Sequence, residues 1–528
     1  MALTGQQLIA GNFSNESSES FRAINPKGKS ELDTDFYEAT ENEINQALEA
    51  ADNAWSSYRT ISPATRADFL EKVADNIVAL GDELIHRAMA ESGLPEARLV
   101  GERGRTVGQL KAFAAVVRDG SWLTASIDTA LPDREPLPKP DIRRMQVSIG
   151  PVIIFGASNF PLAFSVAGGD TASALAAGNP VVVKGHEGHP GTSELVAKAI
   201  SDAAVSLGID PGVISLVQGR SYTVGQALVK HPLAQAVGFT GSLRAGRALF
   251  DSASARPNPI PVYAEMGSIN PIFILPGAMA ERGDALAAGL AGSVALGVGQ
   301  FCTNPGVVIS EKSSDQESFI AAAKTAFEEI APATMLHPGI KAAYDKGCST
   351  LTEEAELLAS SSTAANDEDT EAAAALYSTD AKSFNSNDRL TEEVFGPSTL
   401  LVSADSKDEI LKIAANLDGN LTATIHGTEA DLEAYSELVN ILNTKVGRIV
   451  FNGFPTGVEV CPSMQHGGPY PACSVSNSTS VGAAAITRFS RPVAYQSFPQ
   501  SALPDELKDS NPLGIWRLVN NELSKDSV

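Results

Sequence analysis

Short apolar runs rich in β-branched residues alternate with helix-length segments through most of the sequence. Such alternation indicates βαβ units, in which helices connect parallel strands. A long uncharged segment interrupts this alternation, which then resumes. The two alternating regions predict an α/β fold with two doubly wound parallel-sheet domains. The runs lie at 152–155, 180–184, 213–217, 236–239, 261–266 and 271–275, and then at 307–310, 398–402, 421–425 and 448–451.

The length of 528 residues fits this division, because a domain contains roughly 150 residues. Before the first strand runs, a short β-like opening at 8–21 precedes helices predicted at 41–58, 63–81 and 82–93. We interpret the Pro-rich segment 130–140 as a linker. The Ala/Ser/acidic tract 353–374 is typical of a solvated helical surface.

The charge and the cysteine content exclude several functions. A net charge of −24 argues against a nucleic-acid partner, because phosphate contacts need a basic face. The 4 cysteines form no CxxC pair and show no metal-ligand spacing with the 7 histidines, so neither a disulfide framework nor a bound metal is expected. Reduced cysteines indicate a cytoplasmic setting. The first residues lack the features of a secretory signal.

Two long segments, 145–169 and 285–310, carry no charged residue. Neither is expected to span a membrane, because Gly, Pro and Asn interrupt both and dense Leu, Ile and Phe content is missing. Uncharged segments of this length are expected to be buried, so they are the first places to look for an active site.

The second uncharged segment places Cys302 in a turn, Gly299-Gln-Phe-Cys-Thr-Asn-Pro-Gly306, just before a strand run. A buried cysteine is by itself more often an inert apolar residue than a nucleophile. Cysteine catalysis also needs a proton acceptor and an oxyanion donor, and the sequence offers a candidate for each.

Glu265 and Asn159 are these candidates. Glu265 ends a strand run, where parallel sheets bind ligands, and burial there is expected to raise its pKa into the range of a general base. Asn159 follows the run 152–155 and has an amide suited to an oxyanion. The plain alternatives are a strand-end Glu that points into water and an Asn that caps the next helix.

Two further turns carry groups suited to a phosphate-containing ligand. Gly241-Ser242 follows a strand run and opens a helix, whose N–H groups and dipole attract anions, although the spacing matches neither G-x-G-x-x-G nor a P-loop. Lys184 closes another run and Glu187 follows it, a pair suited to ribose hydroxyls or a phosphate. Taken alone, both are more often surface charges.

Together these residues resemble the aldehyde dehydrogenase superfamily, whose motifs occur here in the family's order. The resemblance implies the aldehyde dehydrogenase fold, in which two doubly wound parallel-sheet domains are joined by a small β oligomerisation arm. The matching motifs are Asn159-Phe-Pro, Lys184 with Glu187, Phe239-Thr-Gly-Ser242, Glu265-Met-Gly267, Gly299-Gln-x-Cys302, Glu393-Val-Phe395-Gly-Pro397 and Asn452.

The resemblance also implies a role for each motif. Cys302 is the implied nucleophile, Glu265 the general base and Asn159 the side-chain half of an oxyanion hole. An aldehyde would become a carboxylic acid through a thiohemiacetal and a thioester on Cys302, without a metal. The implied nicotinamide-cofactor contacts are Lys184 and Glu187 to the adenosine ribose, Gly241 and Ser242 to the pyrophosphate, and Glu393 and Phe395 to the nicotinamide ribose and ring.

Some residues depart from the common family pattern, among them the stretch 455–471, which lacks the usual Gly-Gly-Tyr-Lys ending. In these departures the sequence resembles a bacterial branch of the family. That branch contains 2-oxoglutarate-semialdehyde (2,5-dioxovalerate) dehydrogenases and an NADP-dependent fatty aldehyde dehydrogenase. In this branch His466 is expected to reach Cys302; the alternative is an ordinary loop histidine. We interpret Cys348, Cys461 and Cys473 as structural.

The sequence leaves the cofactor open between NAD and NADP. Glu187 favours NAD because it would repel a 2′-phosphate, whereas Lys184 and Arg220 favour NADP. A substrate tunnel is expected between the rings of Phe160, Phe164 and Phe301. Arg105 shares a predicted helix face with Gln109 and Phe113, and a substrate carboxylate at Arg105 would make the substrate a semialdehyde acid.

The leading interpretation is an NAD(P)-dependent oxidoreductase that converts 2-oxoglutarate semialdehyde to 2-oxoglutarate. A medium- or long-chain fatty aldehyde dehydrogenase and a CoA-acylating semialdehyde dehydrogenase stay open. A Cys–His hydrolase would leave the cofactor motifs unexplained. A non-catalytic relative is disfavoured because Cys302, Glu265 and Asn159 are all present.

The expected dinucleotide-binding domain covers 1–138 and 150–270, and the catalytic domain covers 271–470. The resemblance implies an oligomerisation arm at 139–149, a strand at 487–500 that joins a neighbouring subunit, and therefore a homodimer or homotetramer. The alternation in 143–149 permits such an arm. A C-terminal tail is expected at 501–528, and no membrane partner is expected.

Overall fold

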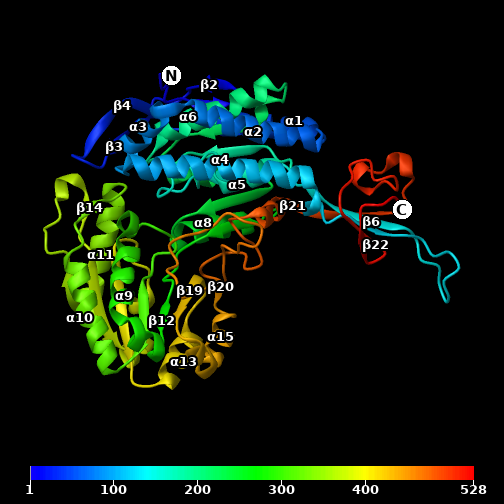
Figure 1. Ribbon diagram of the computed structural model, residues 1–528. Coiled ribbons are helices and arrows are strands. Elements are labelled where there is room, and N and C mark those ends of the chain that lie inside the picture. The colour runs from blue at the N-terminus through cyan, green and yellow to red at the C-terminus, as the bar shows by residue number, and fades with distance from the viewer. Residues whose placement is uncertain (1) are drawn as a thin grey trace.

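The computed structural model describes residues 2–528, so residue 1, with which the first expected domain begins, lies outside the described residues. Two α/β bodies lie one above the other, and an arm projects from their side (Figure 1). Each body is built on a seven-stranded sheet, and a separate five-stranded sheet forms the arm. The two predicted parallel-sheet units are therefore confirmed.

The upper body has the strand order β11-β10-β7-β8-β9-β1-β2. The five strands from β11 to β9 are parallel, and the β1–β2 hairpin adds an antiparallel edge. Parallel strands are covered on both faces and therefore read as continuous apolar runs. The strands are β1 (Gln7–Ile9), β2 (Asn12–Ser14), β7 (Val152–Phe155), β8 (Val181–Lys184), β9 (Ile214–Val217), β10 (Ala236–Thr240) and β11 (Val262–Glu265).

The three helices predicted at 41–58, 63–81 and 82–93 begin and end within two residues of the prediction. Thr40 and Glu43 form a capping box at the start of α1, and Gly93, with φ 68°, ends α3. The helices are α1 (Glu41–Tyr58), α2 (Pro63–Ala79), α3 (Gly81–Ser92), α4 (Glu96–Asp119), α5 (Gly169–Ala176), α6 (Pro190–Ser206), α7 (Tyr222–Lys230) and α8 (Leu243–Ser254). Strands β3 (Ser20–Asn25) and β4 (Ser30–Tyr37) form a separate hairpin.

The lower body has the strand order β15-β17-β18-β13-β12-β19-β20, in which only β15 is antiparallel to its neighbour. Its strands are β12 (Ile272–Ile274), β13 (Val307–Glu311), β15 (Glu356–Ser360), β17 (Ala375–Asp380), β18 (Ser398–Ala404), β19 (Asn420–His426) and β20 (Val446–Phe451). Its longer helices are α9 (Pro276–Ala295), α10 (Ser314–Glu328), α11 (Pro338–Glu354), α13 (Lys407–Asn416) and α15 (Ser436–Leu442).

The predicted helical surface at 353–374 is wrong beyond residue 354, where α11 ends. The segment contains β15 and the short strand β16 (Glu371–Ala372). Strand β15 pairs with β17 and buries Ala359, so edge pairing and burial outweigh the helix-favouring composition of this tract.

The arm brings together segments from the middle and the end of the chain. Its order is β21-β6-β5-β22-β23, and β6 (Ile142–Ser148) pairs antiparallel with β21 (Ser490–Gln496). Segment 130–140 is the turn between β5 (Ser126–Asp128) and β6 rather than a linker. The expected tail contributes β22 (Arg517–Val519) and β23 (Glu522–Ser524), which extend the same sheet.

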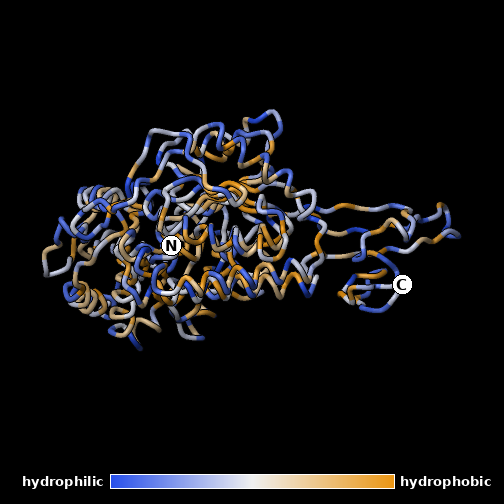
Figure 2. Tube along the Cα trace, turned by 90° about the horizontal axis from the view of Figure 1, so that it is seen from above, coloured by the Kyte–Doolittle hydropathy of each residue, from blue (hydrophilic) through white to orange (hydrophobic). Residues whose placement is uncertain are grey.

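The hydropathy of the chain separates the bodies from the arm. Viewed from above, apolar residues gather inside the two bodies, while the arm is a thin projection with mixed polarity (Figure 2). The largest apolar cluster packs helices α2, α4 and α6 against the upper sheet. In the described part of the chain, no helix combines the length and the apolar character needed to cross a bilayer.

Asn179 fastens the base of the arm to the upper sheet, and its side chain is fully buried. Its Oδ1 accepts the N–H groups of Ile149 (2.7 Å) and Gly150 (3.0 Å), and its Nδ2 donates to the carbonyls of Ala174 (3.2 Å) and Phe489 (2.8 Å). We expect Asn179→Ala to lower the free energy of unfolding by about 3 kcal/mol, because buried polar groups lose their partners.

Thermal denaturation followed by circular dichroism measures this effect. The matched control is Asn12→Ala, since the exposed Asn12 side chain donates only to the carbonyl of Ala10 (3.3 Å). Equal midpoint temperatures for the two variants would contradict a structural role for Asn179.

Candidate active site

Cys302 lies at the junction of the two bodies, in the turn that leads from α9 to β13. Within this turn Gly299 has φ 66°, and a Cβ there would lie 2.2 Å from the backbone of Gly396. Only glycine fits this close approach. The Asn270 side chain then donates to the Cys302 carbonyl (2.8 Å), which fixes the backbone at the cysteine.

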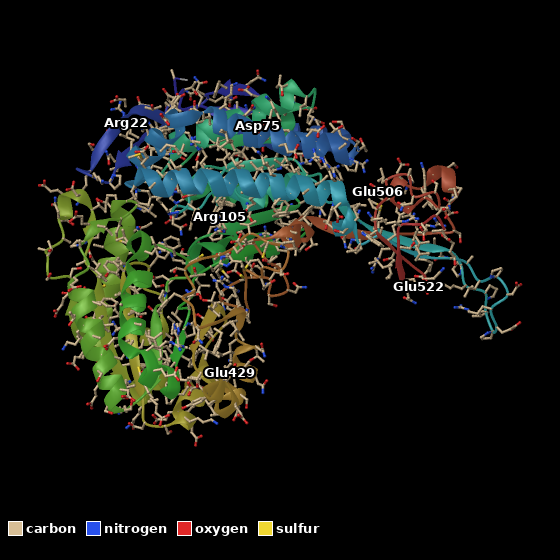
Figure 3. The ribbon with its side chains drawn as sticks, viewed as in Figure 1. Arg22, Asp75, Arg105, Glu429, Glu506 and Glu522 are labelled. Atoms are coloured by element: carbon tan, nitrogen blue, oxygen red, sulfur yellow. The ribbon has the colours of Figure 1, made fainter. Side chains whose placement is uncertain are left out.

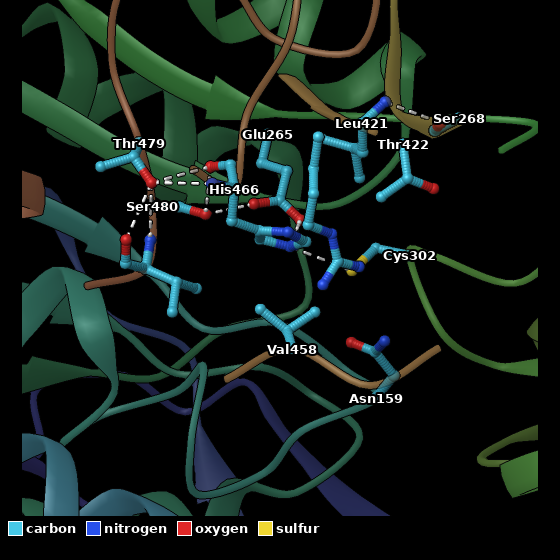
Figure 4. Close-up of polar contacts among 12 residues, drawn as sticks. Asn159, Glu265, Ser268, Cys302, Leu421, Thr422, Val458, His466, Thr479 and Ser480 are labelled. Atoms are coloured by element: carbon cyan, nitrogen blue, oxygen red, sulfur yellow. Dashed lines mark hydrogen bonds and ion pairs between the residues drawn. The ribbon is translucent and has the colours of Figure 1, made fainter. Parts of the chain in front are cut away.

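Cys302, His466 and Glu265 form a contiguous polar cluster (Figure 4). The Cys302 Sγ lies 3.4 Å from His466 Nε2, and the same nitrogen lies 3.0 Å from Glu265 Oε1. The His466 and Glu265 side chains are almost fully buried, whereas Cys302 is partly exposed. The predicted approach of His466 to Cys302 is confirmed.

Burial and the neighbouring carboxylate raise the pKa of the Cys302 thiol well above its usual value. The predicted rise in the pKa of Glu265 is wrong. Burial does oppose its ionisation, but the attraction of His466 and hydrogen bonds from His466 and Ser480 outweigh that effect and lower its pKa. The resting site therefore holds a carboxylate beside a protonated thiol.

Ser480 and Thr479 support this cluster from a loop near the C-terminus. The Ser480 hydroxyl donates to Glu265 Oε2, and the Thr479 hydroxyl accepts the backbone N–H of His466 (2.9 Å). Sequence reasoning missed both residues. They lie more than 200 residues from Glu265 in the chain and no motif marks them, so only the fold brings them to the site.

Asn159 reaches the cluster from the turn after β7. Its Nδ2 donates to the Gln300 carbonyl (3.0 Å), two residues before Cys302 in the chain. The two uncharged segments therefore meet at one place, as the sequence predicts.

A cavity of about 320 Å³ opens on one side of Cys302. Glu393 lies in its wall, where desolvation of the carboxyl group raises its pKa. A Cβ at Gly267 would lie 2.6 Å from Glu393 Oε2, so glycine there leaves space for this carboxylate. The expected cofactor residues that line the cavity are Gly241, Ser242, Glu393 and Phe395, together with Asn159 and Cys302.

Three further residues expected at the cofactor lie outside that lining. Lys184 Nζ and Glu187 form an ion pair (3.4 Å) after the end of β8. Burial opposes ionisation of Glu187, but His186 and Lys184 lower its pKa to about 2, so it stays charged. The Arg220 guanidinium instead lies over the ring of Phe21, 5.9 Å from its centroid.

A second cavity, of about 380 Å³, opens on the other side of Cys302. Phe160 packs edge-on against Phe164 and Phe301, with centroids 5.2 and 5.4 Å apart. Figure 3 shows Arg105 on the side of α4 that faces the lower body. The expected substrate residues Arg105, Phe160, Phe164, Phe301 and His466 all line this cavity, whereas Gln109 and Phe113 do not.

Arg98 is a second cation in this wall and was missed by sequence reasoning. It lies two helical turns before Arg105 on α4, a spacing that could have identified it. Its guanidinium lies 4.3 Å from the centroid of Phe160 and 5.1 Å from that of Phe301. The Nε atoms of Arg98 and Arg105 are buried without a hydrogen-bond partner, while a terminal nitrogen of Arg98 faces Glu102 and one of Arg105 donates to the Val458 carbonyl.

Glu102 lies between the two arginines and holds the Asn159 turn. Its Oε1 accepts the N–H groups of Leu162 (2.8 Å) and Ala163 (3.0 Å), and Oε2 faces Arg98 (3.4 Å). Helix α4 thus supports both the cavity wall and the turn that carries Asn159.

Known proteins are similar to this sequence over almost its whole length. The model of the Aldehyde dehydrogenase family matches residues 13–474. Alpha-ketoglutaric semialdehyde dehydrogenase 2 of Azospirillum brasilense is 51% identical over 519 residues, which cover 98% of this chain and 99% of that protein. Alpha-ketoglutaric semialdehyde dehydrogenase of Acinetobacter baylyi is 45% identical over 523 residues, 99% of each chain.

Solved structures share the fold at lower identity. Gamma-glutamyl-gamma-aminobutyraldehyde dehydrogenase of Burkholderia cenocepacia superposes with a TM-score of 0.81 at 20% identity, covering 94% of this chain and 97% of that one. Methylmalonate-semialdehyde dehydrogenase of Oceanimonas doudoroffii superposes with a TM-score of 0.80 at 19% identity, covering 94% of this chain and 99% of that one. From the family match and these relatives, the chain belongs to the aldehyde dehydrogenase family.

Proposed function

We propose that the protein oxidises a carboxylate-bearing semialdehyde, preferentially 2-oxoglutarate semialdehyde, to the corresponding acid with NAD or NADP. The observation that carries this proposal is the cavity that leads to Cys302 with two arginines, Arg98 and Arg105, in its wall. Burial lowers the pKa of both guanidinium groups, and a substrate carboxylate would offset that cost. The names of the two full-length relatives support the same substrate.

The first half-reaction uses the Cys302 cluster. As Sγ attacks the aldehyde carbon, the thiol proton passes to the Glu265 carboxylate, and His466 Nε2, 3.4 Å from Sγ and 3.0 Å from Glu265 Oε1, stabilises the developing thiolate. The Asn159 amide and the Cys302 backbone N–H donate to the developing alkoxide. Glu265 thus supplies the base that a protonated thiol requires, and it releases this proton to solvent before the second half-reaction.

NAD or NADP, when bound, supplies the hydride acceptor that turns the thiohemiacetal into a thioester. Two residues would hold the cofactor in place. Ser242 caps α8, whose N-terminal N–H groups attract a pyrophosphate, and the Glu393 carboxyl group can accept hydrogen bonds from the nicotinamide ribose hydroxyls. We assign the adenosine ribose to Lys184 and Glu187. The upper body would then be the dinucleotide-binding domain and the lower body the catalytic domain.

The second half-reaction hydrolyses the thioester. Glu265, with His466, accepts a proton from a water molecule as its oxygen attacks the acyl carbon, the Cys302 thiolate leaves, and the acid is released. A base that can activate water argues against CoA as the acyl acceptor. The three phenylalanine rings favour an apolar aldehyde as the alternative substrate, but a fatty chain would offer no negative charge to Arg98 and Arg105.

Strand β21 has an unpaired edge in the arm. Strand edges of this kind pair readily with another chain, which supports the expected homodimer or homotetramer.

We expect His466→Asn to lower kcat by roughly 100-fold or more, because the Cys302 thiolate loses the imidazole that stabilises it. The rate of Cys302 alkylation by iodoacetamide should fall in parallel, since alkylation also needs the thiolate. Reduced-nicotinamide absorbance at saturating aldehyde measures the first effect, and mass spectrometry of the alkylated chain measures the second.

Cys302→Ala is the reference variant and should show no turnover. The matched control is Cys461→Ser, which removes a thiol outside the cluster and should keep wild-type rates. Turnover by Cys302→Ala would overturn the assigned nucleophile, and wild-type alkylation of His466→Asn would overturn the role of His466.

We expect Arg105→Ala to raise KM for 2-oxoglutarate semialdehyde by roughly 10- to 100-fold, the effect of losing a charged hydrogen bond. KM for hexanal, which lacks a carboxylate, should change far less. Arg103→Ala is the matched control, because Arg103 lies on the same helix but donates to the Gly81 carbonyl. Equal effects on both aldehydes would exclude a substrate carboxylate at Arg105.

We expect Glu187→Gln to raise the ratio of kcat/KM for NADP to kcat/KM for NAD by roughly tenfold or more, since a fixed negative charge near a 2′-phosphate is removed. Initial rates at varied cofactor concentration measure the ratio. Glu281→Gln, on helix α9 of the lower body, is the control. An unchanged ratio would place the adenosine ribose elsewhere.

A further inference from the structure

Three side chains of different chemistry point their ligand atoms at one position in the active site. Cys302 Sγ, His466 Nε2 and a Glu265 carboxylate oxygen all lie within 4.8 Å of one another. The sequence gives no sign of this, because Cys302 and His466 are 164 residues apart and form no spaced motif.

Two of these separations are close to those between ligands of a tetrahedral zinc ion. Bond lengths of about 2.3 Å to sulfur and about 2.1 Å to nitrogen and oxygen place S and N about 3.6 Å apart and N and O about 3.4 Å apart. The observed distances are 3.4 Å and 3.0 Å. Shifts of a few tenths of an ångström, within side-chain freedom, would complete the geometry.

A second observation also points to a ligand. Glu265 Oε1 is buried and directed at His466 Nε2, 3.0 Å away. The other oxygen, Oε2, is held by the Ser480 hydroxyl, which orients the carboxylate so that Oε1 faces the nitrogen and the sulfur. Such an outer hydrogen bond is typical of metal-binding carboxylates.

We infer that Cys302, His466 and Glu265 bind one Zn²⁺ ion, which inhibits the enzyme by occupying its nucleophile. Thiolate, neutral imidazole and carboxylate are preferred zinc ligands, and their two negative charges neutralise the ion in a buried site. The thiol proton is released to solvent, and the imidazole binds through Nε2 with its proton on Nδ1. Cys302 and His466 line the second cavity, so the fourth position opens toward water or substrate.

This inference does not depend on the proposed substrate, because the ion binds the resting enzyme without aldehyde or cofactor. The test uses the full-length protein freed of metal with a chelator. Zn²⁺ binding is measured by competition with a chromophoric chelator, and Co²⁺ replaces Zn²⁺ as a spectroscopic probe of a thiolate ligand. We expect one ion per chain, a thiolate-to-cobalt charge-transfer band, and inhibition that excess chelator reverses.

Cys302→Ser, His466→Asn and Glu265→Gln should each weaken Zn²⁺ binding by at least roughly tenfold, and Ser480→Ala by roughly tenfold through the outer hydrogen bond. Cys461→Ser and Cys348→Ser are the thiol controls and should bind as wild type. As a test that needs no variant, Zn²⁺ should protect Cys302 of the wild type from iodoacetamide. No binding by the wild type, no protection, or unchanged binding by Cys302→Ser or His466→Asn would overturn the inference.

Discussion

The contact between His466 and Glu265 beside the Cys302 sulfur is the interaction on which the site depends. Burial makes a lone thiolate and a lone carboxylate costly, and the two would also repel each other. The imidazole between them compensates for both effects: it attracts the carboxylate, which stays ionised, and it faces the thiol, which stays protonated until a substrate arrives. Ser480 and Thr479 hold these side chains in place, because Ser480 donates to Glu265 and Thr479 accepts the backbone N–H of His466.

The arrangement of the two bodies determines what can reach the sulfur. The strands of the upper sheet end at Glu265 and near Asn159, while the lower body supplies the turn with Cys302. Cys302 therefore lies between two cavities, one lined by the cofactor motifs and the other by phenylalanine rings and arginines. A hydride acceptor and an aldehyde can thus approach opposite sides of one atom, as the chemistry of the family requires.

Helix α4 links substrate choice to the oxyanion side of the site. Arg98 and Arg105 face the second cavity, and Glu102 between them binds the turn that carries Asn159. Arg105 also donates to the Val458 carbonyl (2.7 Å), and Arg448 holds the carbonyls of Pro455 and Gly457 in the same loop. Guanidinium groups from both bodies therefore fix the loop that forms the outer wall of this cavity.

The sequence by itself determined the two parallel sheets, the helix ends near Thr40 and Gly93, and the motif residues around Cys302, because strand runs, caps and tight glycine turns are local properties of the chain. It misjudged the pKa of Glu265 and the tract 353–374, and it missed Ser480 and Arg98. Only the tertiary structure decided these points, since the pKa of a buried carboxylate and the pairing of an edge strand depend on partners hundreds of residues away, which no local pattern records.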